Sequence, residues 1–246
     1  MYAFQERLLF FPQPLPEARR VEIGTRYPAV EENFITSPEG RLHAWHVNAG
    51  AQAPLVIYFG GNAEEVSWMI QEAVRIPGVS WLLTDYRGYG LSEGSPGEAA
   101  LVADALAWYD KVVDRKQRVF VFGRSLGSGV AVQLAAVRPV QGVILVTPYD
   151  SIAAVAKRHY WYLPVDLLLK HRFDSIARAP ALKVPLLCLI AEEDAVIPPE
   201  HAERLYAAWG GPKQKLLLQA AGHNSIDAHP LFWPTIREFV TQQRVH

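Results

Sequence analysis

The sequence predicts an α/β protein in which one domain, residues 1–246, is built on a mostly parallel eight-stranded sheet with helices on both faces. Three observations predict this class. After Pro54, six short apolar runs alternate with longer stretches of helical spacing, which is typical of a parallel sheet buried on both faces. Two further runs before Pro54 flank a turn. A Gly-x-Ser-x-Gly sequence joins one strand to the helix that follows it.

The predicted elements follow in order along the chain. The opening segment, to about Pro28, is interrupted by prolines and is expected to be extended. Residues 32–36 and 41–47 flank a Ser-Pro-Glu-Gly turn and are expected to pair as antiparallel strands. The other strands are expected at residues 55–59, 79–83, 119–122, 143–146, 186–190 and 215–218. The helices are expected at residues 63–75, 98–113, 126–137, 201–209 and 231–242.

One long segment without a clear strand, residues 149–183, interrupts this alternation. A stretch of this length is more often functional than incidental, and an insertion after a late strand is expected to form a cap over the site. Tyr149, Tyr160 and Trp161 are the aromatic residues in it that we expect to contact substrate. The alternative is that these aromatics pack the cap onto the body of the fold.

The charge balance and the single cysteine limit the function classes. Lysine and arginine number 24 against 25 aspartates and glutamates, so there is no electrostatic argument for nucleic acid as a partner. Cys188, the one cysteine, lies in an apolar run, cannot form an internal disulfide and is expected to be a buried strand thiol. A lone cysteine is compatible with the cytosol and does not exclude the periplasm.

The N-terminus predicts a cytoplasmic protein. It has no basic segment followed by an apolar one, and no apolar run approaches the ~20 residues that span a bilayer. Residues 8–12, Leu-Leu-Phe-Phe-Pro, are apolar for a chain end and are expected to pack across the body of the fold. Membrane association is expected only through this stretch or through an upstream anchor removed from the original protein, and a removed anchor would mean a membrane-associated or periplasmic location.

The Gly-x-Ser-x-Gly sequence places Ser125 between Gly123 and Gly127, where a strand meets a helix. A sharp turn of this kind strains the serine backbone, and the chain passes only if the residues two positions away lack bulk. In return, the hydroxyl stands clear of the backbone. Ser125 is therefore the candidate nucleophile.

A serine hydroxyl needs a neighbouring base to accept its proton. In a parallel sheet, ligands gather at the carboxyl ends of the strands, so the base is expected on a loop that follows another strand. Of the eight histidines, only His223 follows a predicted strand and a small-residue turn. His223 is therefore the candidate base, and His229 is the alternative.

The imidazole must be held in one tautomer, which a carboxylate does by accepting from its other nitrogen. Asp194 lies on the loop after the strand at 186–190 and is the candidate acid. Glu192 and Glu193 on the same loop, and Asp150 after the preceding strand, are the alternatives. The chain order is then serine, acid, histidine, each on the loop that follows its own strand.

Two backbone N–H groups are expected to form an oxyanion hole. One is that of Leu126, directly after the candidate nucleophile. The second is expected in the turn at residues 58–63, where Asn62 is the best candidate and Gly61 and Ala63 are the alternatives. No phosphate-binding glycine pattern, metal-ligand cluster or cofactor motif is present, so neither a metal nor a cofactor is expected.

Four blocks of the sequence together resemble α/β-hydrolases, specifically single-domain serine hydrolases related to prolyl oligopeptidase-like peptidases and palmitoyl-protein thioesterases. The blocks are Tyr58-Phe59-Gly60-Gly61-Asn62-Ala63, Asp85-Tyr86-Arg87-Gly88-Tyr89-Gly90-Leu91-Ser92, Gly123-Arg124-Ser125-Leu126-Gly127-Ser128-Gly129, and the loops of Asp194 and Gly222-His223. They span about residue 55 to the C-terminus. The resemblance implies the α/β-hydrolase fold with a short cap and a Ser-Asp-His triad. In the second block, which is highly specific to these hydrolases, Asp85 and Arg87 are expected to brace the loop beside the site.

The chain departs from this family at Gly60-Gly61, where the family commonly has His-Gly. The backbone donor survives the change, because it needs no side chain. The departure puts in question the hydrogen bonding that normally stiffens this loop.

The predicted function is a serine hydrolase that cleaves a carboxylic ester or a thioester of a small-molecule or acylated substrate through a covalent acyl-enzyme. Peptide hydrolysis is less favoured, because no separate gating domain or charged substrate clamp is visible. The alternatives are a serine peptidase or amidase of the same fold and a non-catalytic binding protein that retains the fold. A membrane-attached depalmitoylating enzyme is a third alternative, which requires an anchor.

Overall fold

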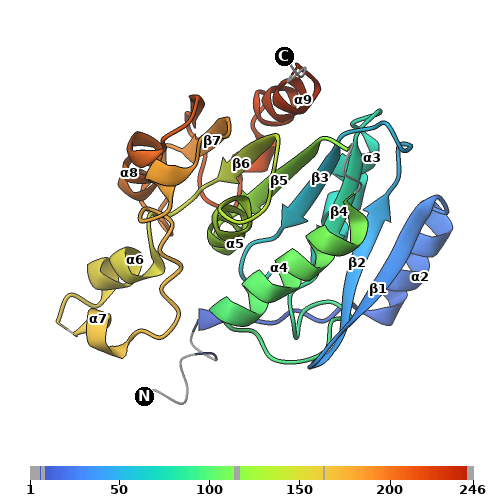
Figure 1. The fold of residues 1–246 in the computed structure, drawn as a ribbon, viewed down its shortest axis with the longest axis horizontal. Helices are drawn as coiled ribbons and strands as arrows, with labels where there is room; N and C mark the ends of the chain where they lie inside the picture. Colours follow the sequence, from blue (N-terminus) through green and yellow to red (C-terminus); the bar gives the residue numbers. More distant parts are fainter. Residues whose placement is uncertain (1–5, 7–8, 114–116, 163, 243–246) are drawn as a thin grey trace.

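The computed structural model describes residues 6, 9–113, 117–162 and 164–242. Its eight-stranded sheet has the order β1-β2-β4-β3-β5-β6-β7-β8 (Figure 1). The pairs β1–β2 and β2–β4 are antiparallel, and the other pairs are parallel, which confirms the predicted fold class. The strands are β1 Val30–Ser37, β2 Gly40–Val47, β3 Leu55–Phe59, β4 Ser80–Thr84, β5 Val119–Arg124, β6 Gly142–Val146, β7 Leu186–Ala191 and β8 Lys213–Leu218.

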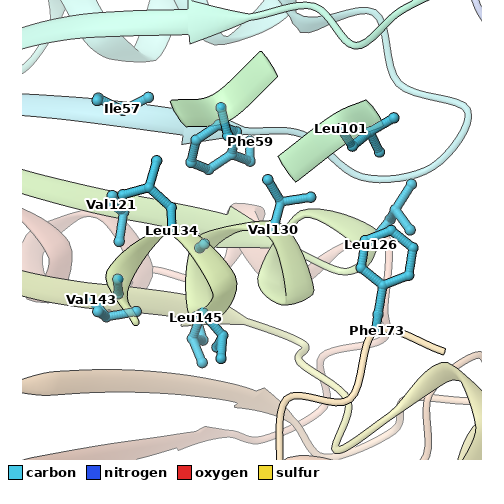
Figure 2. Packing of buried hydrophobic residues seen from close by; sticks show 14 of the residues in the cluster. Ile57, Phe59, Leu101, Val121, Leu126, Val130, Leu134, Val143, Leu145 and Phe173 are labelled. Carbon is cyan, nitrogen blue, oxygen red and sulfur yellow. The ribbon is translucent and has the colours of Figure 1, made fainter. Parts of the chain in front are cut away.

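Helices cover both faces of this sheet. Because successive strand residues point to opposite faces, each face carries its own core. Ile57 and Val121 pack with residues of α4, α5 and α8, whereas Val56 and Phe120 pack with residues of α2, α3 and α9. Figure 2 shows the first of these cores, in which α5 lies against the strands. The helices are α2 Glu17–Arg26, α3 Met69–Val74, α4 Glu98–Val112, α5 Leu126–Ala135, α6 Ile152–His159, α7 Val165–Leu168, α8 Pro199–Ala208 and α9 Phe232–Gln242.

Two expectations for the N-terminal half are wrong. The opening segment is not extended throughout, because α2 begins directly after Pro16, where a missing N–H costs the helix nothing. Ile23, on the inner face of α2, is 1% exposed and packs in the core. The helix expected at 63–75 is shorter, because Ala63 has a left-handed φ of 55° and the following residues form a loop and a 3-10 turn before α3.

The N-terminal apolar stretch packs on the body of the fold through Leu9 and Phe10, whereas Phe11 is 50% exposed. Phe10 is 2% exposed and stands edge-on to His171, with their ring centroids 5.3 Å apart. Residue 8 of the predicted stretch lies outside the described residues. Within the described ranges, no helix combines the length and the apolar character needed to cross a bilayer.

The segment predicted as a cap leaves the sheet after β6 and returns to it at β7. It carries α6 and α7 and projects to one side of the sheet (Figure 1). Ion pairs connect it to the body, among them Arg158 with Glu200 at 3.1 Å, Lys170 with Glu6 at 2.8 Å and Asp150 with Arg204 at 2.7 Å. That this segment covers the site stays a prediction.

Candidate active site

Ser125 occupies the strained turn that the sequence predicts between β5 and α5. Its φ is 50°, a conformation that L residues rarely adopt, and its N–H donates to the carbonyl of Val146 at 2.9 Å. Neither flanking glycine has room for a side chain. A Cβ on Gly123 would lie 2.3 Å from the Gly127 carbonyl oxygen, and one on Gly127 would lie 2.1 Å from the Phe59 carbonyl oxygen. The close approach of these three backbone segments raises the serine hydroxyl above the sheet edge.

The structure brings together the three side chains that the sequence predicts as a triad. His223 Nε2 lies 3.0 Å from Ser125 Oγ, and His223 Nδ1 lies 2.7 Å from Asp194 Oδ2. The other oxygen of Asp194 accepts from the N–H groups of Val196 at 2.9 Å and Ile197 at 2.7 Å. These two bonds fix the carboxylate, so that it can hold the imidazole with its Nε2 facing the serine.

The alternative acid and base are engaged elsewhere. Asp150 accepts from His201 and from Arg204, each at 2.7 Å. Burial raises the pKa of Asp150, but these hydrogen bonds outweigh burial and leave it below its usual value. His229 accepts from the N–H of Leu231 before α9. Both residues therefore serve the fold around the site.

The candidate oxyanion donors are the backbone N–H groups of Leu126 and Asn62. Among the described residues, none accepts from the backbone N–H of Leu126 or of Asn62. The N–H of Gly61, an alternative donor, donates instead to Glu64 Oε2 at 2.7 Å. The side chain of Asn62 is also held in place, because it donates to the Leu9 carbonyl at 2.6 Å and accepts from Tyr89 Oη at 2.8 Å. This arrangement leaves the Asn62 N–H available.

Glu64 stiffens the loop in which the chain departs from the family that it resembles. Besides the Gly61 N–H, its carboxylate accepts from Tyr58 Oη at 2.6 Å and from Trp68 Nε1 at 2.9 Å. Burial, followed by the neighbouring Glu64 charge, raises the pKa of Tyr58 well above its usual value, so the phenol remains a donor. Sequence reasoning missed Glu64, and the signal that could have found it is an acid three residues after the second glycine of the turn.

Arg124, the variable residue of the elbow, was also missed. Its guanidinium lies 5.6 Å from the centre of the Trp68 ring and 3.4 Å from Asp227 Oδ1. Its Nη2 also approaches the carbonyl of His223 at 3.5 Å. Arg124 therefore connects the elbow to the loop that carries the candidate base.

A cavity of about 520 Å³ opens directly at Ser125. Charged, amide and apolar side chains line it together, and the described residues of the 149–183 segment contribute none of its lining. Its lining residues are Gly61, Asn62, Ala63, Glu64, Glu65, Trp68, Arg124, Ser125, Val196, His223 and Asn224. No group of three or more metal-ligating side chains is found in the described part of the chain.

The three aromatics predicted to contact substrate lie outside this cavity. Tyr149 is fully buried, and its hydroxyl donates to the Leu126 carbonyl at 3.0 Å. We therefore correct its role, because a core residue beneath the elbow supports the elbow and cannot reach a substrate in the cavity. Tyr160 and Trp161 are 51% and 82% exposed on the segment between α6 and α7, and their contact with substrate stays a prediction.

Asp85 and Arg87 brace the loop beside the site, as expected. Asp85 Oδ2 lies 2.6 Å from Nδ1 of the buried His43. Arg87 donates twice to Asp104, at 2.7 Å each, and also to Glu39. Neither side chain lines the cavity at Ser125, which agrees with a structural role.

Comparison with known proteins places this chain in a family. A family model described as "Serine aminopeptidase, S33" matches residues 51–165. An uncharacterized protein of Mycobacterium tuberculosis is 35% identical over an alignment that covers 100% of this chain and 90% of that protein. The lysophosphatidylserine lipase ABHD12 of Danio rerio is 32% identical over an alignment that covers 71% of this chain and 57% of that protein.

The likeness extends to solved structures. An esterase of Pyrococcus furiosus superposes with a TM-score of 0.66 at 20% identity, over 87% of this chain and 92% of the esterase chain. At this identity, the likeness is one of fold alone. The narrower relation to prolyl oligopeptidase-like peptidases and palmitoyl-protein thioesterases stays a prediction. The full-length relative, the sheet order and the elbow agree, and the chain belongs to the α/β-hydrolase superfamily.

Proposed function

We propose that the protein is a serine hydrolase that cleaves a carboxylic ester or a thioester through a covalent acyl-enzyme. The observation that carries this proposal is the contact series from Asp194 through His223 to Ser125, with separations of 2.7 and 3.0 Å. A non-catalytic binding protein has no need to hold all three groups in this order. The free N–H groups beside the serine add the second part that acyl transfer requires.

The geometry supports the following sequence of steps. His223 Nε2 accepts the Ser125 proton as Oγ attacks the acyl carbon, while Asp194 accepts from Nδ1 and stabilises the imidazolium. The N–H groups of Leu126 and Asn62 donate to the oxyanion. His223 then donates its proton to the leaving oxygen or sulfur, and a water molecule repeats the attack to release the acid.

Ester cleavage is favoured over peptide cleavage by the named relatives. One is a lysophosphatidylserine lipase and another, alike in fold, is an esterase. The family description, serine aminopeptidase, favours the second candidate, a peptidase or amidase. The cavity, which mixes Glu64, Arg124 and Asn224 with Trp68 and Val196, suits a polar leaving group.

The test is a comparison of substrate classes on the intact protein. We expect hydrolysis of short-chain p-nitrophenyl esters and of matching acyl thioesters, slower turnover of aminoacyl amides, and labelling by a fluorophosphonate probe at Ser125. Faster cleavage of the amides would favour the peptidase. The absence of both turnover and labelling would favour the binding protein.

Replacement of Asp194 with asparagine is expected to lower kcat by about 10³- to 10⁴-fold, because the amide no longer holds the base in the productive tautomer. Asp150→Asn is the matched control. It removes a carboxylate that accepts from His201 and Arg204, so we expect lower thermal stability with much of the turnover retained. Kinetics on one ester and thermal melts of both variants check this, and a larger loss of turnover in Asp150→Asn would reverse the assignment of the acid.

Replacement of Glu64 with glutamine is expected to lower kcat about 10- to 100-fold with little change in KM, because loop position matters most when the oxyanion forms. In wild type, both carboxylate oxygens of Glu64 accept from N–H or O–H groups. The NH2 group of the new glutamine side chain would therefore face a donor and could not accept from it. Steady-state kinetics check this. The control is Glu72→Gln, because Glu72 lies on α3 and pairs with Arg75. It should leave kcat and KM unchanged. An unaltered kcat in Glu64→Gln would remove Glu64 from the positioning of this loop.

A further inference from the structure

An exposed aromatic cluster lies on the segment between α6 and α7. Tyr160, Trp161, Tyr162 and Leu167 are 51%, 82%, 64% and 81% exposed, and we call these four residues the aromatic tip. Figure 1 shows this segment, in yellow, at the outer end of the molecule and away from the sheet. Single exposed apolar residues are common on protein surfaces, but four large ones within so short a stretch mark an interaction site.

The base of the segment is anchored, whereas the tip is not. Before the tip, Ile152 and Val155 of α6 pack against the core, and after it Phe173 is fully buried; within the stretch, Val165 is 7% exposed. In the tip, Trp161 and Tyr162 contact each other edge to face, with ring centroids 5.9 Å apart. The tip is therefore held outward on a fixed support, which lowers the entropy that would be lost on binding.

The chemistry of the tip and of its flanks fits a lipid bilayer. Tryptophan and tyrosine concentrate at membrane interfaces, where an apolar ring enters the lipid and the polar group stays in water. Exposed cations stand on both sides of the tip, Lys157 and Arg158 before it and Lys170 and Arg172 after it. Asp166 is the one acidic residue in 157–172, although the whole chain has a net charge of −1.

We propose that the aromatic tip docks the protein on an anionic lipid bilayer, with the rings in the headgroup region and the flanking cations facing lipid phosphate and carboxylate groups. The ion pairs of Arg158 with Glu200 and of Lys170 with Glu6 are partly exposed and therefore weak, so anionic lipid competes with them. Along the chain, Glu200 follows the loop of Val196, which lines the cavity, and Glu6 precedes Leu9, whose carbonyl accepts from the Asn62 side chain. If the proposed function holds, docking brings the cavity close to lipid-borne esters.

The test is co-sedimentation of the full chain with vesicles of phosphatidylcholine alone or mixed with phosphatidylserine. We expect binding to the mixed vesicles that weakens with salt, and about tenfold weaker binding to neutral ones. The double variant Trp161→Ser/Tyr162→Ser should bind at least about tenfold more weakly than wild type, because its interfacial rings are gone. Lys157→Ala/Arg172→Ala should lose the preference for phosphatidylserine.

The matched control is Leu231→Ser, which removes a residue that is 52% exposed directly before α9, a helix that Figure 1 shows far from α7. It should sediment as wild type does, and thermal melts should show every variant folded. Equal sedimentation of the tip variant and wild type, or binding of wild type to neither vesicle, would overturn the proposal. So would a wild-type dimer in light scattering that becomes a monomer when the tip is replaced, since the tip would then join two copies of the chain. Ser125→Ala should sediment as wild type does, which separates docking from the proposed chemistry.

Discussion

Replacing Ser125 with alanine is expected to lower kcat for a short-chain ester by about 10⁵-fold or more and to abolish fluorophosphonate labelling. The change removes one oxygen, the one that lies 3.0 Å from His223 Nε2. The backbone contacts of the elbow remain, because the Val146 carbonyl still accepts from the N–H of residue 125. Folding should therefore be retained while the chemistry is lost. Steady-state kinetics and intact-protein mass spectrometry after labelling measure both effects.

Ser128→Ala is the matched control for this loss, because Ser128 is the other serine of the elbow. Its hydroxyl is buried and donates to the Ser125 carbonyl at 2.7 Å, so it cannot reach a substrate. Its removal is expected to cost about 1 kcal/mol of stability and to leave labelling intact. Turnover or labelling that survives in Ser125→Ala would show that a different residue reacts.

Replacing Gly127 with alanine is expected to lower the free energy of unfolding by on the order of 3 kcal/mol or more and to remove most activity with it. The new Cβ would lie 2.1 Å from the Phe59 carbonyl oxygen and 2.7 Å from that of Gly60. Both are backbone atoms, so the end of β3 must move away from α5. That movement displaces the loop of Asn62 from the serine. Urea unfolding of the purified variant, together with ester turnover, measures the two effects.

Gly24→Ala controls for the loss of a glycine as such. Gly24 lies within α2, and a Cβ built there meets no atom within 4 Å. We expect this variant to gain up to about 1 kcal/mol, because alanine is the better helix former. A Gly127→Ala protein as stable as wild type would contradict the close backbone approach on which the elbow geometry depends.

The regular elements were predictable because their signals are local. The strand at 55–59 agrees with β3 at both ends, and the other parallel strands shift by one or two residues. Apolar runs specify buried strands wherever both faces are covered. α2 was missed because the prolines around it concealed a helix whose burial rests on one side chain, Ile23. The polarity of these residues is a weak predictor of the helix, since packing against the sheet decides whether it forms.

The three candidate catalytic side chains were predictable from the sequence, whereas the residues that hold their loops in place were less so. Ser125, Asp194 and His223 each follow a strand, and a parallel sheet brings the ends of its strands together. Glu64 was missed, because its three donors become visible only once the turn folds back on itself. Tyr149 was expected to contact substrate and lies in the core, because α5 and Phe173 close over it.

By itself, the sequence determined a mostly parallel α/β sheet and a sharp Gly-x-Ser-x-Gly turn between a strand and a helix, and its resemblance to α/β-hydrolases predicted the class. The sheet and the turn follow from hydrophobic periodicity and from the space that a sharp turn allows, both of which are set by neighbouring residues. The tertiary structure alone decided which side chains line the cavity, that Glu64 holds the loop of Gly61, and that Tyr149 faces inward while Trp161 faces solvent. The orientation of a side chain depends on what packs against it from distant parts of the chain, and local spacing carries no record of those partners.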